Sequence, residues 1–171
     1  VLSSLVKFLP LTPNGETPVR ALTIAGTDSG GGAGIQADSR TMALLGVHAC
    51  VAVAAVTVQN TVGVTGFHEI PPDVVAAQVR SVVSDIGVGA AKTGMLASTA
   101  IIEAVTAVCT EVGIGRDQPV PLVVDPVCAS MHGDPLLHAE WPAGWNGLWW
   151  DDAVGLGKDT VEKLWGELAR E

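Results

Sequence analysis

Short apolar runs alternate with amphipathic segments along most of the chain. Residues 19–26, "VRALTIAG", are typical of a buried parallel strand, and a glycine-rich stretch ends this run. Residues 34–46 predict a helix that stops at Gly46, with an apolar face formed by Ile35, Met42 and Leu45. Residues 47–59, "VHACVAVAAVTVQ", predict a second strand that is covered on both faces. Together these segments predict a β-α-β unit.

The same alternation continues to about residue 127. Residues 62–70 predict a short extra strand or one arm of a hairpin. The spacing of apolar residues predicts helices over 71–87 and 98–113. Residues 89–96 and 121–127 predict two further strands. Because strands alternate with helices, we expect an α/β fold with a mostly parallel sheet.

Two segments lie outside this pattern. Residues 1–18 are typical of a loose extension, because their apolar stretch is too short to cross a bilayer and no basic region precedes it. Near the other end, all five tryptophans lie between Trp141 and Trp165. We therefore expect an extension over 1–18, one domain over 19–137 and a tryptophan-rich tail over 138–171.

Composition narrows the classes of function. The formal net charge of -9 opposes binding to nucleic acid or to an anionic membrane surface, since both need clustered lysine and arginine. Cys50, Cys109 and Cys128 are odd in number and have no metal-like spacing, so we expect reduced thiols in a cytoplasmic protein. The four histidines form no HExxH pair, so no metal site is expected.

The stretch "AGTDSGGGAGIQAD", residues 25–38, invites comparison with known phosphate loops. It lacks the lysine and hydroxyl residue that complete a P-loop. Its GxGxxA spacing is a weak match to the dinucleotide fingerprint, which also needs a carboxylate about 20 residues further on. The chain has Thr57, Gln59 and Asn60 there instead. An amide is a good reader of the edge of a nitrogen heterocycle, so these residues favour a flat, nitrogen-bearing ring.

The predicted strand exits meet at the carboxyl edge of the sheet, where ligands bind in open α/β sheets. Several side chains at these exits also have plain structural interpretations. Asp28 is more typical of a turn cap than of a Mg²⁺ ligand, and Met95 is by default a core residue. Lys92 either pairs with Asp125 on a neighbouring strand end or extends to solvent. Cys128 is more typical of a small buried side chain than of a nucleophile.

Five motifs in one register carry a resemblance to a known family. The stretches "ALTIAGTDSGGGAGIQAD", "AVTVQNTVGV", "VVAAQV", "AAKTGMLAS" and "VVDPVCASMHGDPLL" resemble the hydroxymethylpyrimidine and phosphomethylpyrimidine kinases of thiamine biosynthesis. The resemblance implies a three-layer, ribokinase-like α/β sandwich. It also implies a transferase that uses ATP and Mg²⁺ to phosphorylate 4-amino-5-hydroxymethyl-2-methylpyrimidine and then its monophosphate.

Carried over by position, the resemblance implies a set of substrate-binding residues. Gln59 would bind the aminopyrimidine edge, and Asp38 would lie near the hydroxymethyl group. Without the resemblance, Gln59 is a polar strand-end residue and Asp38 an acid early in a helix. The implied set is Gly26, Ala33, Asp38, Gln59, Met95 and Val127.

The family continues for about as long again as the part that this chain resembles, so we expect the substrate-binding half only, a truncated version of the fold. In the family the missing half supplies the nucleotide pocket and the catalytic turn. Residues 155–160, "GLGKDT", resemble such a turn only by chance, and Met131 and His132 stand where many relatives carry a lysine. The catalytic residue therefore stays unassigned.

Three hypotheses on function remain. The chain is part of a pyrimidine kinase, a non-catalytic or defective pyrimidine-binding fragment, or a related vitamin kinase that acts on pyridoxal. Exposed sheet edges also favour self-association, so a homo-oligomer is among the expectations.

Overall fold

A computed structural model describes residues 17–115, 117–125, 127 and 136 of the chain. The strands are β1 (Arg20–Ala25), β2 (His48–Val53), β3 (Ala55–Gln59), β4 (Val64–Glu69), β5 (Ala90–Thr93) and β6 (Leu122–Val124). The helices are α1 (Gly34–Leu44), α2 (Pro72–Asp85) and α3 (Thr99–Glu111).

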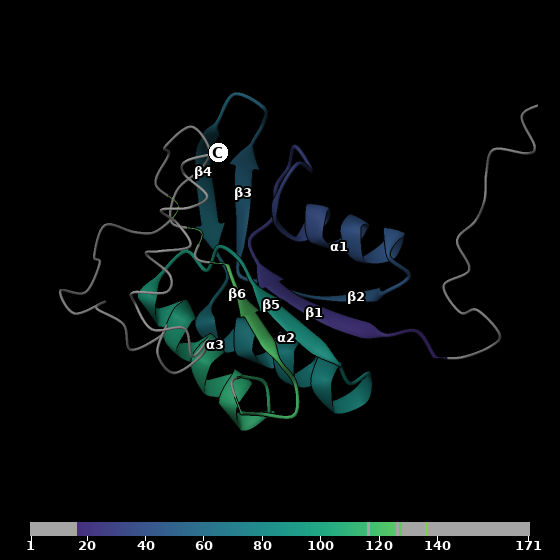
Figure 1. Ribbon diagram of the computed structural model, residues 1–171. Helices are drawn as coiled ribbons and strands as arrows, with labels where there is room; N and C mark the ends of the chain where they lie inside the picture. Colours follow the sequence, from purple (N-terminus) through teal and green to yellow (C-terminus); the bar gives the residue numbers. More distant parts are fainter. Residues whose placement is uncertain (1–16, 116, 126, 128–135, 137–171) are drawn as a thin grey trace, which may run out of the picture.

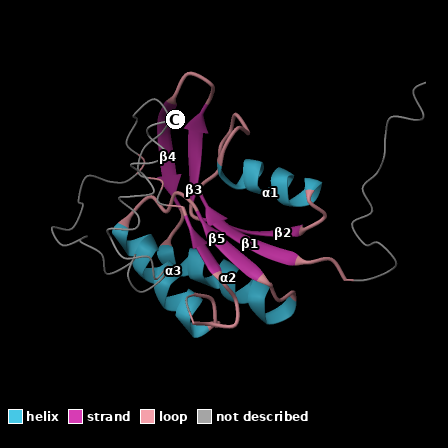
Figure 2. Ribbon diagram, viewed as in Figure 1, coloured by secondary structure: helices cyan, strands magenta, loops and turns pink. Residues whose placement is uncertain are grey.

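The main sheet has the strand order β2-β1-β5-β6, and all of its pairs are parallel. Helix α1 lies on one face of this sheet, and α2 and α3 lie on the other (Figure 1). The resulting three layers are easily followed by secondary structure in Figure 2. The predicted α/β fold with a mostly parallel sheet is therefore confirmed.

The core lies mainly between the sheet and the α2–α3 layer. Leu22 and Ile24 of β1 are fully buried there, as are Val75 and Val79 of α2. Helix α3 contributes Ile101, Ile102, Val105, Val108 and Cys109. This packing confirms the two helices that the spacing of apolar residues predicted, although Ile86, counted with the first of them, lies beyond α2 and is 36% exposed.

The prediction of one continuous strand over 47–59 is wrong. The chain leaves the main sheet at Ala54, whose N–H donates to Ala25 O at 2.9 Å and whose carbonyl accepts from Ile70 N–H at 2.9 Å. Just before it, the Gln78 side chain of α2 accepts from Val53 N–H at 2.9 Å and donates to Val53 O at 3.1 Å. Ala54 thus still bonds β1 through its N–H while its carbonyl bonds the residue after β4, and β3 starts here in a new direction.

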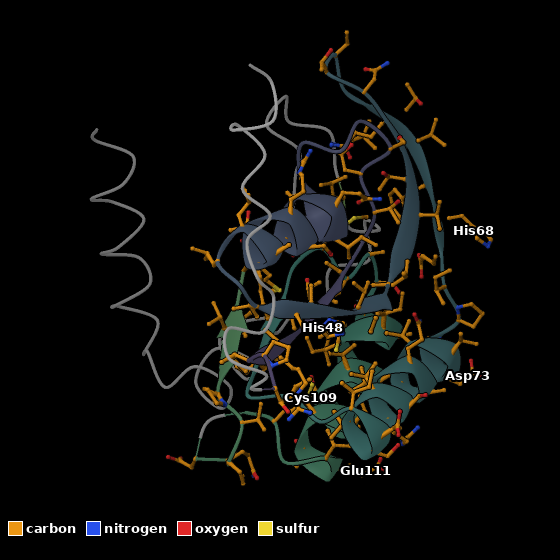
Figure 3. All side chains as sticks on the ribbon, turned by 90° about the vertical axis from the view of Figure 1, so that its right-hand side faces the viewer. His48, His68, Asp73, Cys109 and Glu111 are labelled. Carbon is orange, nitrogen blue, oxygen red and sulfur yellow. The ribbon has the colours of Figure 1, made fainter. Side chains whose placement is uncertain are left out.

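Strands β3 and β4 form an antiparallel hairpin, which confirms the hairpin arm predicted for 62–70. The hairpin extends beyond the carboxyl ends of the main sheet (Figure 1). Its side chains alternate, with Ala55 and Thr57 buried and Val56 and Val58 exposed. His68, which pairs with Val56, points away from the body of the molecule in Figure 3.

The predicted helix starts and stops are close to the observed ones. Pro72 and Asp73 lie in the first turn of α2, where a proline needs no hydrogen-bond partner and a carboxylate favours the helix dipole. Helix α1 ends before Gly46, which has a φ of 76°. Leu45, expected on the apolar face of this helix, lies beyond its last residue and is 75% exposed, so that part of the prediction is wrong.

Several sequence predictions lie outside the described residues. These concern the extension over 1–16, Cys128, the pair Met131 and His132, and the tail over 138–171. Within the described part of the chain, no helix is both long and apolar enough to cross a membrane.

Candidate functional site

A cavity of about 570 Å³ lies where the strand exits meet. Its walls come from the glycine-rich loop before α1, the β3–β4 hairpin and the exits of β5 and β6. Such a position, at the carboxyl edge of a parallel sheet, is where ligands bind in open α/β folds. All of the substrate-binding residues expected from the resemblance line this one cavity: Gly26, Ala33, Asp38, Gln59, Met95 and Val127.

The glycine-rich loop is organised around the carboxylate of Asp28. This side chain accepts hydrogen bonds from the backbone N–H groups of Gly30, Gly32 and Ala33, each at 2.8 Å. The residue is only 5% exposed. The interpretation of Asp28 as a turn cap is therefore confirmed. These amides, which could otherwise hold a phosphate, are already bound to an anion of the chain itself.

Gly34, at the start of α1, allows two backbone segments to approach closely. Its φ is 57°, and a Cβ atom at this position would lie 2.5 Å from Gly26 O. The neighbouring Ile35 N–H donates to the same carbonyl at 3.1 Å. Only glycine satisfies both the dihedral angle and the space, so α1 can start directly over the end of β1.

The glycine-rich loop is joined to β3 by the backbone bond from Thr27 N–H to Ala55 O at 2.8 Å and by four bonds that involve side chains. Thr57 N–H donates to Thr27 Oγ1 at 2.9 Å, and Thr57 Oγ1 donates to Thr27 O at 2.7 Å. Two residues further on, Gln59 N–H donates to Ser29 Oγ at 2.8 Å, and Ser29 Oγ donates to Gln59 O at 2.6 Å. The matching two-residue spacing, T-x-S against T-x-Q, is a signal that sequence reasoning missed.

The two amides at the end of β3 have different roles. Asn60 Oδ1 accepts from Val62 N–H at 2.8 Å and from Gly63 N–H at 3.3 Å, so this side chain closes the hairpin turn. The Gln59 backbone is held by Ser29 as described, and Gln59 lines the cavity. Both residues line the cavity, and the side chain of Asn60 is the one bound within the turn.

Asp38 of α1 lies above the centre of the sheet. Its carboxylate accepts from Thr23 Oγ1 at 2.6 Å and from Lys92 Nζ at 3.1 Å on each oxygen. Lys92 Nζ also lies 3.5 Å from Asp125 Oδ2, so the predicted pairing with Asp125 is confirmed. The contact with Asp38 escaped the sequence analysis, although Thr23 and Lys92 are register partners on adjacent strands.

Gly26 and Met95 form the floor between β1 and the exit of β5. Gly26 N–H donates to Met95 O at 3.0 Å, and a Cβ at Gly26 would meet Met95 Sδ at 3.0 Å. Met95 is 6% exposed and belongs to the core as well as to the cavity wall. Both interpretations of Met95, core residue and cavity residue, therefore hold at once.

The described residues offer little to a metal ion or to the phosphates of a nucleotide. Among them, no group of three or more His, Cys, Asp or Glu side chains could hold a metal. The loop amides that resemble a phosphate cradle are bound to Asp28.

Burial governs the ionisation of the two described cysteines. Cys50 and Cys109 are free and buried. Burial raises the pKa of the Cys109 thiol to about 11 and also raises the pKa of Cys50. Both thiols therefore stay neutral near pH 7 and pack as small apolar groups.

Comparison with known protein families gives one match that spans most of the chain. Residues 28–145 match the family described as phosphomethylpyrimidine kinase. The chain belongs to the phosphomethylpyrimidine kinase family. Except for residues 25–27, the residues that line the cavity lie within this matched region.

Curated relatives carry the same family name. The hydroxymethylpyrimidine/phosphomethylpyrimidine kinase of Mycobacterium leprae is 64% identical to this chain over 135 residues. These residues cover 79% of this chain and 47% of the relative. The corresponding kinase of Mycobacterium tuberculosis is 68% identical over 132 residues, covering 77% and 46%. The chain thus spans about half the length of the curated relatives that it matches.

Solved structures give the same family and confirm the ribokinase-like fold. The phosphomethylpyrimidine kinase of Clostridium difficile 630 is 38% identical, with a TM-score of 0.63, and the match covers 71% of this chain and 50% of that one. An ADP complex of Bacillus subtilis pyridoxal kinase is 36% identical, with a TM-score of 0.56, covering 64% and 41%. Both structures are thus similar to this chain over about two thirds of its length.

Proposed function

We propose that this chain provides the pyrimidine-binding part of a hydroxymethylpyrimidine/phosphomethylpyrimidine kinase. The reaction would be the ATP-dependent phosphorylation of 4-amino-5-hydroxymethyl-2-methylpyrimidine, followed by that of its monophosphate, in thiamine biosynthesis. The observation that carries this proposal is the single cavity at the strand exits, lined by all of the residues that the family resemblance implies. The family match and the named relatives support the same function.

The cavity chemistry suits an aminopyrimidine. The carboxamide of Gln59 offers an acceptor and donors in one plane, as the edge of an aminopyrimidine requires. Met95 and Val127 provide apolar surface for the ring, and Gly26 and Ala33 let it approach the backbone. In this proposal Asp38 lies near the hydroxymethyl group.

We include ATP and Mg²⁺ in the proposal because the family uses them, and not because of any feature of the described cavity. The loop amides are bound to Asp28, and the described residues contain no cluster suited to a metal. We assign the cytoplasm as the compartment, supported by the free thiols of Cys50 and Cys109. The homo-oligomer expected from the sequence stays a prediction that sedimentation velocity can test.

Calorimetric titration of the full chain tests the proposal. We expect hydroxymethylpyrimidine to bind more tightly than pyridoxal. Gln59→Ala should weaken hydroxymethylpyrimidine binding about tenfold or more, because ring atoms then lose hydrogen bonds in a partly buried site. Gln118→Ala removes an exposed amide that does not line the cavity, so it is the matched control.

The outcomes separate the three hypotheses. ATP consumption with hydroxymethylpyrimidine by the purified chain supports the kinase directly. Binding without turnover favours the non-catalytic fragment. Tighter binding of pyridoxal than of hydroxymethylpyrimidine contradicts the proposed substrate.

A further inference from the structure

The ammonium of Lys92 lies between two carboxylates that come from different parts of the fold. Asp38 is on α1, above one face of the sheet, and Asp125 follows the end of β6. Lys92 itself is on β5, between β1 and β6 in the sheet. All three residues line the cavity, and 27% of the Lys92 side chain is exposed.

The two contacts of Lys92 are unequal. Its Nζ lies 3.1 Å from both oxygens of Asp38, whose side chain is 16% exposed and also accepts from Thr23. The distance to Asp125 Oδ2 is 3.5 Å, and the Asp125 side chain is 49% exposed. A longer and more exposed ion pair is weaker, because solvent screens it and solvates its partners. Asp125 is therefore the partner that Lys92 can release.

Lys92 is also the positive side chain that an anion in this cavity would meet. Among the described lining residues, Asp28, Asp38 and Asp125 carry negative charge and Lys92 carries positive charge. Asp28 is bound by loop amides, and Asp38 by Lys92 and Thr23. Gly94 leaves space beside the ammonium, since a Cβ at that position would lie 3.6 Å from Lys92 Nζ.

We propose that Lys92 is a specificity-determining residue, which keeps its contact with Asp38 and exchanges Asp125 for the phosphate of a phosphorylated pyrimidine. This inference rests on the proposed function, because it concerns how the same cavity accepts two forms of one ligand. The neutral alcohol leaves the Lys92–Asp125 pair in place. The monophosphate competes with Asp125 for the ammonium, and a charge-assisted contact with phosphate replaces the weaker ion pair.

The test measures the ratio of the dissociation constants of hydroxymethylpyrimidine and its monophosphate by calorimetry on the full chain. Lys92→Met should shift this ratio toward the alcohol by about tenfold, the effect of losing one charge-assisted contact. Asp125→Asn should shift it toward the monophosphate by about threefold to tenfold, because the competing charge is gone. Lys92→Arg keeps the charge and should stay within about threefold of the wild-type ratio, since a guanidinium also binds phosphate.

Arg80→Met is the matched control for removing a cation. Arg80 pairs with Glu111 at 2.7 Å, with side chains 49% and 52% exposed, and Arg80 does not line the cavity. Figure 3 shows Glu111 at the end of the molecule opposite the hairpin. This variant should leave the ratio unchanged.

The ratio separates a role in specificity from a role in folding. A merely structural Lys92 would weaken both ligands together in Lys92→Met and leave the ratio at its wild-type value, which would overturn the inference. If Asp125→Asn left the ratio of the two dissociation constants unchanged, this would overturn the proposal that phosphate replaces Asp125 at Lys92. A wild-type chain that binds neither compound would contradict the proposed function itself.

Discussion

Cys109 is a residue whose ionisation is coupled to folding. It is 3% exposed in the core, and burial raises its pKa from 9.0 to about 11. The unfolded chain therefore loses this proton at a lower pH than the folded chain does. Stability should be insensitive to this group below pH 9 and fall by about 2–3 kcal/mol between pH 9 and pH 11. Urea unfolding across this range measures the change.

Cys109→Val is the control for this pH dependence, because it keeps a buried apolar side chain without an ionisable group. The chain contains no tyrosine, which removes another side chain that would titrate in this range. The variant should lose stability less steeply than the wild type above pH 9. Equal slopes in the two proteins would contradict the prediction.

At the same scale, most contacts within one loop could be predicted from the sequence, whereas of the two long-range contacts of Lys92 only the one with Asp125 was among the alternatives. Asp28 caps its own loop through residues two to five positions away, so turn chemistry was enough to predict it. The Lys92–Asp38 contact joins residues 54 positions apart and depends on where α1 crosses the sheet. Family resemblance supplied Asp38 as a candidate, but not its ion pair.

Among the elements, the junction of β1 with α1 depends most strictly on one residue type. Gly34→Ala would place a Cβ 2.5 Å from Gly26 O at a φ of 57°. At Gly46 the φ is similar, 76°, but an added Cβ would have no atom within 4 Å. Gly46→Ala therefore measures only the loss of stability from the left-handed backbone, about 1–2 kcal/mol. We expect Gly34→Ala to cost at least about 1 kcal/mol more, because the two backbone segments must separate.

Thermal or urea unfolding of the two alanine variants gives this comparison directly. Equal losses of stability would mean that the close approach at Gly26 relaxes without cost. Helix boundaries of this kind were predictable from local signals such as Gly46. The break at Ala54 was not, because the contacts around it come from distant segments: Gln78, which bonds the Val53 backbone, lies on a helix 25 positions later in the chain.

For the whole molecule, burial predicts an order of local stability. Strand β1 lies between β2 and β5 and is buried between helix layers, whereas the β3–β4 hairpin exposes Val56, Val58 and Val62. Hydrogen exchange measured on the full chain should therefore be slower in β1 and β5 than around residues 60–63. Uniform exchange over these segments would contradict this order.

The strand order could not be predicted from the pattern of apolar residues. This pattern predicts strands and their parallel pairing but not which strands are neighbours. The order β2-β1-β5-β6 places Lys92 beside Thr23 of β1, which bonds Asp38 of α1, and beside the exit of β6 that carries Asp125. A pattern confined to one segment carries no information on this arrangement. The cavity as a whole was predicted because parallel strands all end at one edge.

The Asp28 carboxylate has a consequence for the kinetics of ligand capture. A loop whose amides are bound by its own side chain is ordered before any ligand arrives. Because the loop is already ordered, ligand binding does not include the entropy loss of ordering this side of the cavity. The encounter with a small ring should then follow a single binding step, and the slow rearrangements typical of lids that fold around a phosphate should be absent from this side of the cavity.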